Sequence, residues 1–366
     1  MQDKNLRVIH VITTIERGGA ENAILALARE QVRNGYHVIV VPLKGALELE
    51  TDFTEAGITL DLTLHSLSFI QQIIIFRSKY NEDFVFHGHL PRSELLLRFC
   101  KAKSGFYVTR HNAEAFFPKA PRLISKILSR FVTCKSISVI AISQAVASFL
   151  LEKKEISSNN PFSVIHYGYL PRCTTRHVER EYRTLNQQFL RIGTISRLTT
   201  QKNLILLIEL GSILRKLNFS FLIQIVGAGP DRLLLENKVK EFGLEDQIHF
   251  LGKKSDVMPF LQEQDVFILT SNYEGFGLVL LEAMDANLPI IAASNSAIPE
   301  VLGENHPGLF ETGNSNSLLH ILLNVLRFPD TYACALNIQS TQLNFFSMEK
   351  YFCAHHQLYM NSKLEL

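Results

Sequence analysis

The sequence predicts an α/β protein with two doubly wound, Rossmann-like domains that face a central cleft. Short apolar runs alternate with longer segments of helical periodicity, which is typical of βαβ units and parallel sheets. The alternation stops once, in a polar stretch over residues 173–188, and then begins again. With 366 residues, of which 46% are hydrophobic, the chain is long enough to build two separate cores.

The first domain is predicted over residues 1–172. Its strand candidates are short runs rich in Val, Ile and Phe, which suit a buried sheet. The segment Glu21–Arg33 has Ala23, Leu25, Leu27 and Ala28 among its apolar positions and predicts a helix after the first strand. The predicted strands are Val8–Ile12, His37–Pro42, Phe84–His87, Phe106–Thr109, Val139–Ile142 and Phe162–His166.

Residues 173–188 are interpreted as a linker, and the second domain is predicted over residues 189–345. It repeats the alternation of apolar runs and helical segments seen in the first domain. Its predicted strands are Leu190–Ser196, Ser220–Val226, Ile248–Leu251, Val266–Thr270, Pro289–Ala292 and Gly308–Phe310. The last segment, Met348–Lys363, has a helical pattern.

Composition excludes several classes of protein. The five cysteines are scattered and form no C-x-x-C pair, so neither a zinc site nor a disulfide framework is predicted. No apolar run reaches the roughly 18 residues that a membrane span needs. The segment before Val8 is too short and too polar for a signal peptide. We therefore expect a cytoplasmic protein.

The charge of the chain is unevenly distributed. Residues 1–172 carry 21 Lys and Arg against 15 Asp and Glu, which gives +6, and the remainder carries 16 against 20, which gives −4. The sum is the formal net charge of +2. A basic first half suits an anionic partner, such as a phosphate or a lipid surface. No nucleic-acid-binding motif is present, so nucleic acid is not an expected partner.

The most informative run contains two carboxylates, Glu274 and Glu282. It reads Tyr-Glu-Gly-Phe-Gly-Leu-Val-Leu-Leu-Glu over residues 273–282, and it follows a strand-like run that ends near Ser271. Glu274 is therefore predicted at the carboxyl end of a strand beside a helix N-terminus, where α/β proteins bind ligands and where free N–H groups favour phosphate. Alternatively, a surface Glu at a helix start only complements the helix dipole.

Two cations and a glycine pair follow other strands of the second domain. Arg197 and Lys202 lie in the loop after the strand Leu190–Ser196, and both residue types bind phosphate oxygens. The alternative is a solvated basic loop. Gly227 and Gly229 form a G-x-G after the next strand, where small residues allow close approach to a ligand or a helix.

The first domain also has candidate residues at its strand ends. Gly18 and Gly19 follow the first strand, but the full G-x-G-x-x-G fingerprint is missing, so a nicotinamide or flavin dehydrogenase is not supported. Three histidines lie at the ends of two later strands or just after them: His87, His89 and His111. Histidines at such positions are more often hydrogen-bonding residues than metal ligands, and no metal or other cofactor is expected.

A basic amphipathic segment lies between the fifth and sixth strands. Lys119, Arg122, Lys126 and Arg130 recur at intervals of three or four residues. Apolar residues fill the other face, namely Leu123, Ile124, Ile127, Leu128 and Phe131. Such a helix can lie on an anionic bilayer. The pattern slightly favours the other interpretation, in which the apolar face packs on the protein's own sheet.

Together these motifs resemble the retaining, metal-independent glycosyltransferases of the GT-B fold, family four type, which are also described as glycosyl transferases group 1. The resemblance spans nearly the whole chain, and its most specific part is the E-x7-E run combined with the upstream Arg and Lys. The other marks are Gly18 to Glu21, His87 to His89, Thr109 to Asn112, Ala141 to Ser143, Gly227 to Pro230 and Phe250 to Gly252. It also implies that the final segment, residues 346–366, crosses back to the first domain.

The resemblance implies a role for each matching residue. Arg197 and Lys202 would hold the donor diphosphate, Glu282 the ribose, and Glu274 the transferred sugar. His111 would hydrogen-bond the sugar or stabilise charge near the anomeric carbon. The other implied donor-binding residues are Gly18, Gly19, Gly227, Lys253, Phe276, Gly277 and Leu278.

The implied reaction moves a sugar from a nucleotide donor, with UDP-sugars favoured, to a glycan or lipid-linked acceptor. We expect it to serve bacterial surface polysaccharide or lipopolysaccharide synthesis at the inner face of the membrane. A GT-B sugar-nucleotide epimerase and a non-catalytic protein of the same fold are the alternatives. One departure is His166-Tyr167-Gly168, where family members often have Asn-Gly, so no family role is carried over to Tyr167.

Overall fold

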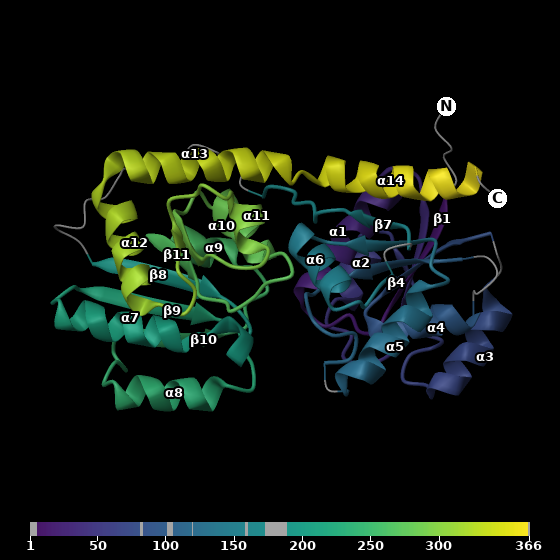
Figure 1. Cartoon of the computed structure of the whole chain (residues 1–366), viewed down its shortest axis with the longest axis horizontal. Coiled ribbons are helices and arrows are strands. Elements are labelled where there is room, and N and C mark those ends of the chain that lie inside the picture. The colour runs from purple at the N-terminus through teal and green to yellow at the C-terminus, as the bar shows by residue number, and fades with distance from the viewer. Residues whose placement is uncertain are drawn as a thin grey trace. The chain divides into compact units, whose positions relative to one another are not determined.

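The computed structural model describes residues 6–80, 83–100, 105–118, 120–157, 160–172 and 189–364. The chain divides into two compact units (Figure 1). Unit 1 comprises Met1–Tyr169 and Phe346–Leu366, and unit 2 comprises Leu170–Phe345. Among the described residues, no helix combines the length and the apolar character needed to cross a bilayer.

Unit 1 is built on a seven-stranded parallel sheet with the strand order β3-β2-β1-β4-β5-β6-β7. The order reverses between β1 and β4, which is the mark of a doubly wound sheet and the usual position of a ligand site. The strands are β1 Arg7–Ile12, β2 His37–Pro42, β3 Thr59–Leu60, β4 Val85–His89, β5 Tyr107–Arg110, β6 Ser138–Ala141 and β7 Phe162–Val164. All residues of β4, β5 and β6 are buried, since helices cover both faces of such a sheet.

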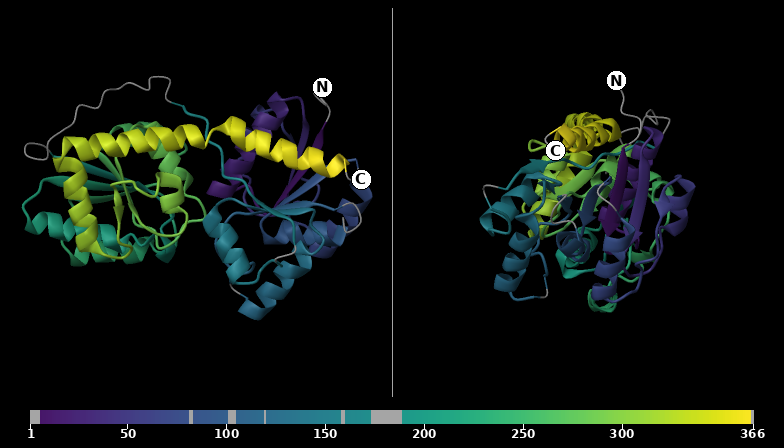
Figure 2. Two further views of the ribbon diagram at one scale, coloured as in Figure 1. Left: turned by 45° about the horizontal axis from the view of Figure 1, so that its top comes forward. Right: turned by 90° about the vertical axis from the view of Figure 1, so that its right-hand side faces the viewer.

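Helices connect these strands, and one more is added by the end of the chain. The connecting helices are α1 Gly19–Arg33, α2 Glu50–Glu55, α3 Phe69–Lys79, α4 Pro91–Cys100, α5 Arg122–Thr133 and α6 Gln144–Glu152. The last helix, α14 Met348–Leu364, packs against α1 (Figure 2). The Tyr359 side chain of α14 is fully buried in the core of unit 1. The implied return of residues 346–366 to the first domain agrees with this packing.

Unit 2 contains a six-stranded parallel sheet with the order β10-β9-β8-β11-β12-β13. Here the order reverses between β8 and β11. The strands are β8 Leu190–Ile195, β9 Phe221–Val226, β10 Ile248–Gly252, β11 Val266–Leu269, β12 Ile290–Ala293 and β13 Leu309–Phe310. The helices are η1 Thr200–Lys202, a single 3-10 turn, and α7 Ile205–Lys216, α8 Arg232–Glu241, α9 Met258–Gln262, α10 Leu278–Asp285, α11 Ile298–Leu302, α12 Ser315–Arg327 and α13 Pro329–Phe345.

The predicted fold class is confirmed, and every predicted strand is present with shifts of one or two residues at its ends. Strand β3 was not predicted, because a strand of two residues carries no periodic signal. The units meet in sequence at Leu170, close to the predicted domain limit at residue 172. The predicted linker over 173–188 lies outside the described residues.

Candidate functional site

The candidate site in unit 2 lies where three neighbouring strands end. β9, β8 and β11 are adjacent in the sheet and parallel, so the loops that follow them leave from the same edge. These loops carry Gly227, the Arg197–Lys202 segment and Glu274. The topology therefore brings together three motifs that are separated by up to about 75 residues in the sequence.

Lys202 and Glu274 form the centre of this site. The Lys202 Nζ atom lies 2.6 Å from Glu274 Oε1, and the two side chains are only 12% and 8% exposed. The Ser271 hydroxyl donates to the same carboxylate oxygen over 2.6 Å, and the backbone N–H of Glu274 donates to Ser296 Oγ over 2.8 Å. A lysine ammonium has three N–H donors, and Glu274 takes one of them. The pair thus holds a partly buried cation in a fixed position.

The loop after β8 is fastened to the loop after β11 by side-chain and backbone hydrogen bonds. The Gln201 side-chain Nε2 donates to Tyr273 O over 3.0 Å, and the backbone N–H of Asn272 donates to Gln201 O over 2.8 Å. The Thr270 hydroxyl donates to Lys202 O over 2.9 Å. Arg197 is exposed and is linked to this network by a 3.4 Å bond to Gln201 Oε1. Arg197 is therefore in the same loop as Lys202 but is held less firmly.

The glycines after β9 have a structural reason to be glycine. Gly227 has φ +140°, and a Cβ atom there would lie 1.8 Å from Ser196 O. A Cβ at Gly229 would lie 2.2 Å from Leu198 O. Gly227 N donates to Gly252 O over 2.8 Å, directly before Lys253. The G-x-G thus lets the loop after β9 pack on the backbone that leads to Arg197, and this contact explains both glycines without a ligand.

Helix α10 begins at the turn that follows Glu274. Gly277 is its N-cap with φ +93°, a conformation that side chains other than glycine rarely adopt. Phe276 is buried, whereas Gly277 and Leu278 are partly exposed. The first N–H groups of a helix have no partner within the helix and carry a partial positive charge. Together with Lys202, this helix start forms a site suited to an anion, and a phosphate in particular.

Glu282 lies on the next turns of α10 and is partly buried. The pKa of Glu282 is raised to about 7, mainly by burial; Arg172 opposes this shift, and Asp256 and Asp285 contribute to it. Arg172 is held by its backbone N–H, which donates to Asp285 Oδ2 over 2.7 Å. Ionising this carboxyl group is unfavourable because of its burial, and ligand hydroxyls that donate hydrogen bonds to it stabilise the ionised form.

Two family sequence models match the chain. The model described as Glycosyltransferase Family 4 matches residues 17–169, and the model described as Glycosyl transferases group 1 matches residues 176–332. The chain belongs to the group 1 glycosyltransferases. Its two parallel-sheet units have the GT-B fold, so the prediction of a group 1 glycosyltransferase is confirmed, while its retaining, metal-independent mechanism stays a prediction.

Individual relatives of this glycosyltransferase support the same family. The amylovoran biosynthesis glycosyltransferase AmsK of Erwinia amylovora is 34% identical over 145 residues, which cover 37% of this chain and 36% of AmsK. The chain thus spans about a third of AmsK. The putative glycosyltransferase EpsF of Bacillus subtilis is 22% identical over 321 residues, 81% of each protein. Among solved structures, Anabaena HepE in complex with UDP and glucose has a TM-score of 0.80 at 16% identity, over 97% of this chain and 100% of HepE.

The candidate residues of unit 1 lie at the ends of β1 and β5. Gly18 is the N-cap of α1 and Gly19 is its first residue, and a Cβ at Gly18 would lie 2.4 Å from Glu21 Oε2. His111 follows β5 and is 7% exposed. Both of its ring nitrogens contact protein groups, since Nε2 lies 3.2 Å from His89 Nδ1 and Nδ1 contacts the Tyr167 hydroxyl. Burial, and then the charge of Arg110, lower the pKa of His111 to about 3, so the ring is neutral.

A small pocket of about 100 Å³ opens beside His111 in unit 1. Leu90, Arg110, Asn112 and Phe116 are among the residues that line it. The Arg110 guanidinium lies 4.3 Å above the Phe116 ring and 3.0 Å from Glu94 Oε2, so its charge is compensated. Gly18, Gly19 and His111 belong to unit 1, and the roles that the resemblance implies for them toward the donor stay predictions.

The packing predicted for the basic amphipathic helix was wrong. Three of its five apolar side chains do not pack on the sheet, since Leu123, Ile124 and Ile127 of α5 are 68%, 50% and 57% exposed. The buried face of α5 instead contains the small residues Ser125, Ser129, Val132 and Thr133. Small side chains allow the helix to lie close to the protein and leave the larger apolar ones outside. Lys119 lies outside the described residues.

Several residues of the buried polar network that contains His111 were not predicted from the sequence. They are His10 on β1, Gln31 on α1, Tyr167 after β7, and His355 and Tyr359 on α14. Tyr167 was set aside as a departure from the family pattern. One sequence feature could have indicated this network: His10 is a polar residue in the middle of an otherwise apolar strand. Its side chain is fully buried in the structure.

Proposed function

We propose that this glycosyltransferase moves a sugar from a UDP-sugar to a glycan or lipid-linked acceptor, with retention of the anomeric configuration and without a metal ion. The observation that carries the proposal is the buried Lys202–Glu274 pair at the start of α10. It combines a fixed cation with a helix N-terminus, and both stabilise a leaving diphosphate. HepE, of the same fold, has been solved with UDP-glucose, which supports the donor class.

In the proposed reaction, the sugar carbon C1 exchanges its bond to the diphosphate for a bond to the acceptor. The bond between C1 of the sugar and the diphosphate oxygen breaks, and its electrons remain on that oxygen. The hydroxyl oxygen of the acceptor forms the new bond to C1, and its proton passes to the released diphosphate. Lys202 and the N–H groups at the start of α10 neutralise the charge that develops on the diphosphate, while Glu274 positions the sugar.

Calorimetric titration with UDP, GDP and ADP, without and with Mg²⁺, tests the donor assignment. We expect UDP to bind best and the binding to be unchanged by Mg²⁺ or by a chelator. The Lys202→Ala variant should lose this binding, whereas Lys216→Ala, which changes an exposed lysine at the end of α7, should keep it. UDP binding that is equal in both variants would overturn the assigned diphosphate site. Release of an epimerised sugar nucleotide without any acceptor would favour the epimerase.

We further propose that the acceptor is assembled at a membrane, for a bacterial surface polysaccharide, and that unit 1 contacts the bilayer through α3, α4 and α5. These helices are neighbours (Figure 1) and expose Ile70, Ile74, Phe99, Leu123, Ile124 and Ile127. Arg122, Lys126 and Arg130 of α5 add positive charge that suits anionic headgroups. AmsK, which acts in amylovoran biosynthesis, supports the polysaccharide assignment.

Sedimentation with vesicles tests this surface. We expect binding to phosphatidylglycerol vesicles, weaker binding to phosphatidylcholine vesicles, and loss of both in the double variant Leu123→Ser, Ile127→Ser. Leu233→Ser is the matched control, because Leu233 is 69% exposed on α8 of unit 2. Unchanged sedimentation of the double variant would contradict the proposed membrane surface.

A further inference from the structure

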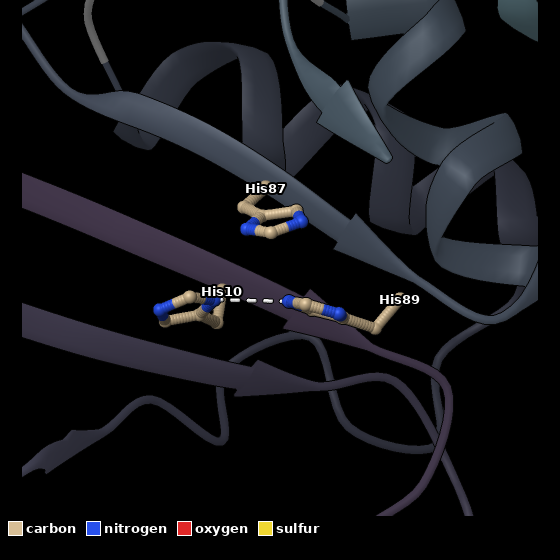
Figure 3. Close-up of side chains that lie close together, drawn as sticks. All are labelled: His10, His87 and His89. Carbon is tan, nitrogen blue, oxygen red and sulfur yellow. Dashed lines mark hydrogen bonds between the residues drawn. The ribbon is translucent and has the colours of Figure 1, made fainter. Parts of the chain in front are cut away.

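Four hydrogen bonds join five buried side chains of unit 1 into one chain. Gln31 Oε1 lies 2.8 Å from His10 Nε2, His10 Nδ1 lies 2.9 Å from His89 Nε2, and His89 Nδ1 lies 3.2 Å from His111 Nε2. The final bond joins His111 Nδ1 to the Tyr167 hydroxyl. Figure 3 shows the bond between His10 and His89 at the centre of the chain. The five residues come from α1, β1, β4 and the segments after β5 and β7.

The three imidazole rings of this chain are neutral. Their exposed fractions are 0% for His10, 2% for His89 and 7% for His111. Burial lowers the pKa of His10 to about 4 and that of His111 to about 3, and it lowers the pKa of His89 well below its ordinary value. A neutral imidazole has one N–H donor and one bare nitrogen acceptor. Each ring must therefore donate one bond of the chain and accept the other.

Gln31 sets the direction of all four bonds. Its amide oxygen only accepts, so His10 carries its proton on Nε2 and leaves Nδ1 bare. His89 must then donate from Nε2 to His10, and His111 must donate from Nε2 to His89. His111 Nδ1 is left as an acceptor, and the Tyr167 hydroxyl donates to it. Because an amide oxygen does not take up a proton at ordinary pH, this chain of hydrogen bonds fixes the orientation of its side chains and does not conduct protons.

We propose that Gln31, His10 and His89 are positioning residues that hold His111 in the Nε2–H tautomer, with Nδ1 as the acceptor for the Tyr167 hydroxyl. The proposal rests on the proposed transferase function, in which His111 lies beside the sugar. A sugar hydroxyl can replace the Tyr167 hydroxyl as the donor to Nδ1, whereas a carbonyl or phosphate oxygen cannot, since two acceptors cannot share a bond. Residues that fix a tautomer act through the group they orient.

The same histidines have the spacing of a metal site, but their hydrogen bonds favour the chain. One nitrogen from each of His10, His87 and His89 lies within 4.8 Å of the others. However, the nitrogens of His87 face the Tyr359 hydroxyl at 2.6 Å and Thr109 Oγ1 at 2.7 Å. The four nitrogens of His10 and His89 belong to the chain described above. All six nitrogens therefore have protein partners, and a metal ion would have to displace them.

The test uses the full-length protein with ¹⁵N-labelled histidine and a change at Gln31, the end of the chain farthest from His111. Gln31→Met removes the acceptor that sets the direction but keeps the volume and adds no charge. Gln31→Glu keeps an acceptor at the same place. Gln72→Met is the matched control, because Gln72 is also fully buried in unit 1 and its amide nitrogen bonds to Leu43 O and Leu64 O, outside the chain.

We expect the nitrogen shifts of His111, assigned with His111→Asn, to show the Nε2–H tautomer in the wild type. Gln31→Met should give mixed tautomers and a kcat that is lower by about tenfold, with the KM for the nucleotide donor unchanged. Gln31→Glu should restore one tautomer and most of the activity. Gln72→Met should lower the melting temperature alone.

Three results would overturn the proposal. They are a His111 proton on Nδ1 in the wild type, a single unchanged tautomer in Gln31→Met, and one tightly bound Zn²⁺ per chain that His10→Phe removes. The spectra need no substrate. An intact Nε2–H tautomer without any sugar transfer would therefore contradict the transferase function, whereas an active wild type with mixed tautomers would contradict the positioning role.

Discussion

Two buried polar clusters, one in each unit, are stabilised in opposite ways. In unit 2, Lys202 Nζ and Glu274 Oε1 form an ion pair across 2.6 Å at the edge of the sheet. In unit 1, the histidine chain lies within the sheet and carries no charge, because burial lowers the pKa of each ring. The difference follows from chemistry: a buried ion needs a counter-ion, whereas an imidazole can lose its proton and keep its hydrogen bonds.

This difference predicts that acid destabilises unit 1 far more than unit 2. Among the described residues, unit 1 has five histidines with lowered pKa values and unit 2 has His306. Below pH 6.5 the unfolded chain takes up protons that the folded chain excludes, so each such histidine removes about 1.4 kcal/mol of stability per pH unit, down to its lowered pKa in the folded chain. Glu94 in unit 1 and Glu282 in unit 2 have raised pKa values. Their effect on stability is opposite to that of the histidines, because each binds a proton more readily in the folded chain, and it applies to both units.

Hydrogen exchange measures each unit separately. Protection factors of amides in β1 and β4 should fall between pH 7 and pH 5 much more than those in β11 and β12. Equal losses in the two units would show that the histidines of unit 1 are charged in the folded protein.

The charged pair of unit 2 should control the chemistry. Lys202→Ala is expected to lower kcat by about 10²- to 10³-fold, because it removes a fixed cation from the leaving diphosphate. Lys216→Ala should retain full activity. Transfer rates measured with saturating donor and acceptor check this, and a loss of less than threefold in Lys202→Ala would place the diphosphate elsewhere.

The loop packing that positions this pair depends on Gly227. Gly227→Ala places a Cβ against Ser196 O at a φ of +140°, and we expect a loss of about 3 kcal/mol of stability together with weaker nucleotide binding. Gly313→Ala is the matched control, since Gly313 has φ +75° but no atom within 4 Å of the new Cβ. Denaturant unfolding compares the two variants. Equal losses would mean that backbone strain, and not the contact with Ser196, explains the effect.

The smallest expected effect concerns Glu282. Its carboxyl group has a pKa raised to about 7, and the carboxylate form is the better acceptor for ribose hydroxyls. UDP should therefore bind about tenfold more weakly at pH 6 than at pH 8, since about one carboxyl group in ten is ionised one unit below its pKa. Calorimetry at both pH values checks this prediction. Glu282→Gln should bind UDP with little dependence on pH; an unchanged pH dependence would assign it to another group.

The sequence alone determined the fold class, the strands other than β3, and the candidate site of unit 2. Parallel strands covered on both faces must be continuous apolar runs, which are visible in sequence. The motifs around Lys202, Gly227 and Glu274 could be placed because each follows such a strand, and the ends of neighbouring parallel strands meet at one edge. Each apolar run and each strand-end motif is a local pattern, and the rule that the ends of parallel strands meet at one edge is general to parallel sheets.

Tertiary structure alone decided the environment of His111 and the exposed face of α5. The chain from Gln31 to Tyr167 joins five residues whose spacing in sequence has no period, because the order of the strands in the sheet brings them together. The face that α5 buries contains the small residues Ser125 and Ser129, which let the helix lie close to the protein. Hydrophobic periodicity in the sequence does not predict a buried face of this kind. Sequence patterns show which groups are polar, but the partner of each buried polar group depends on the packing of the whole unit.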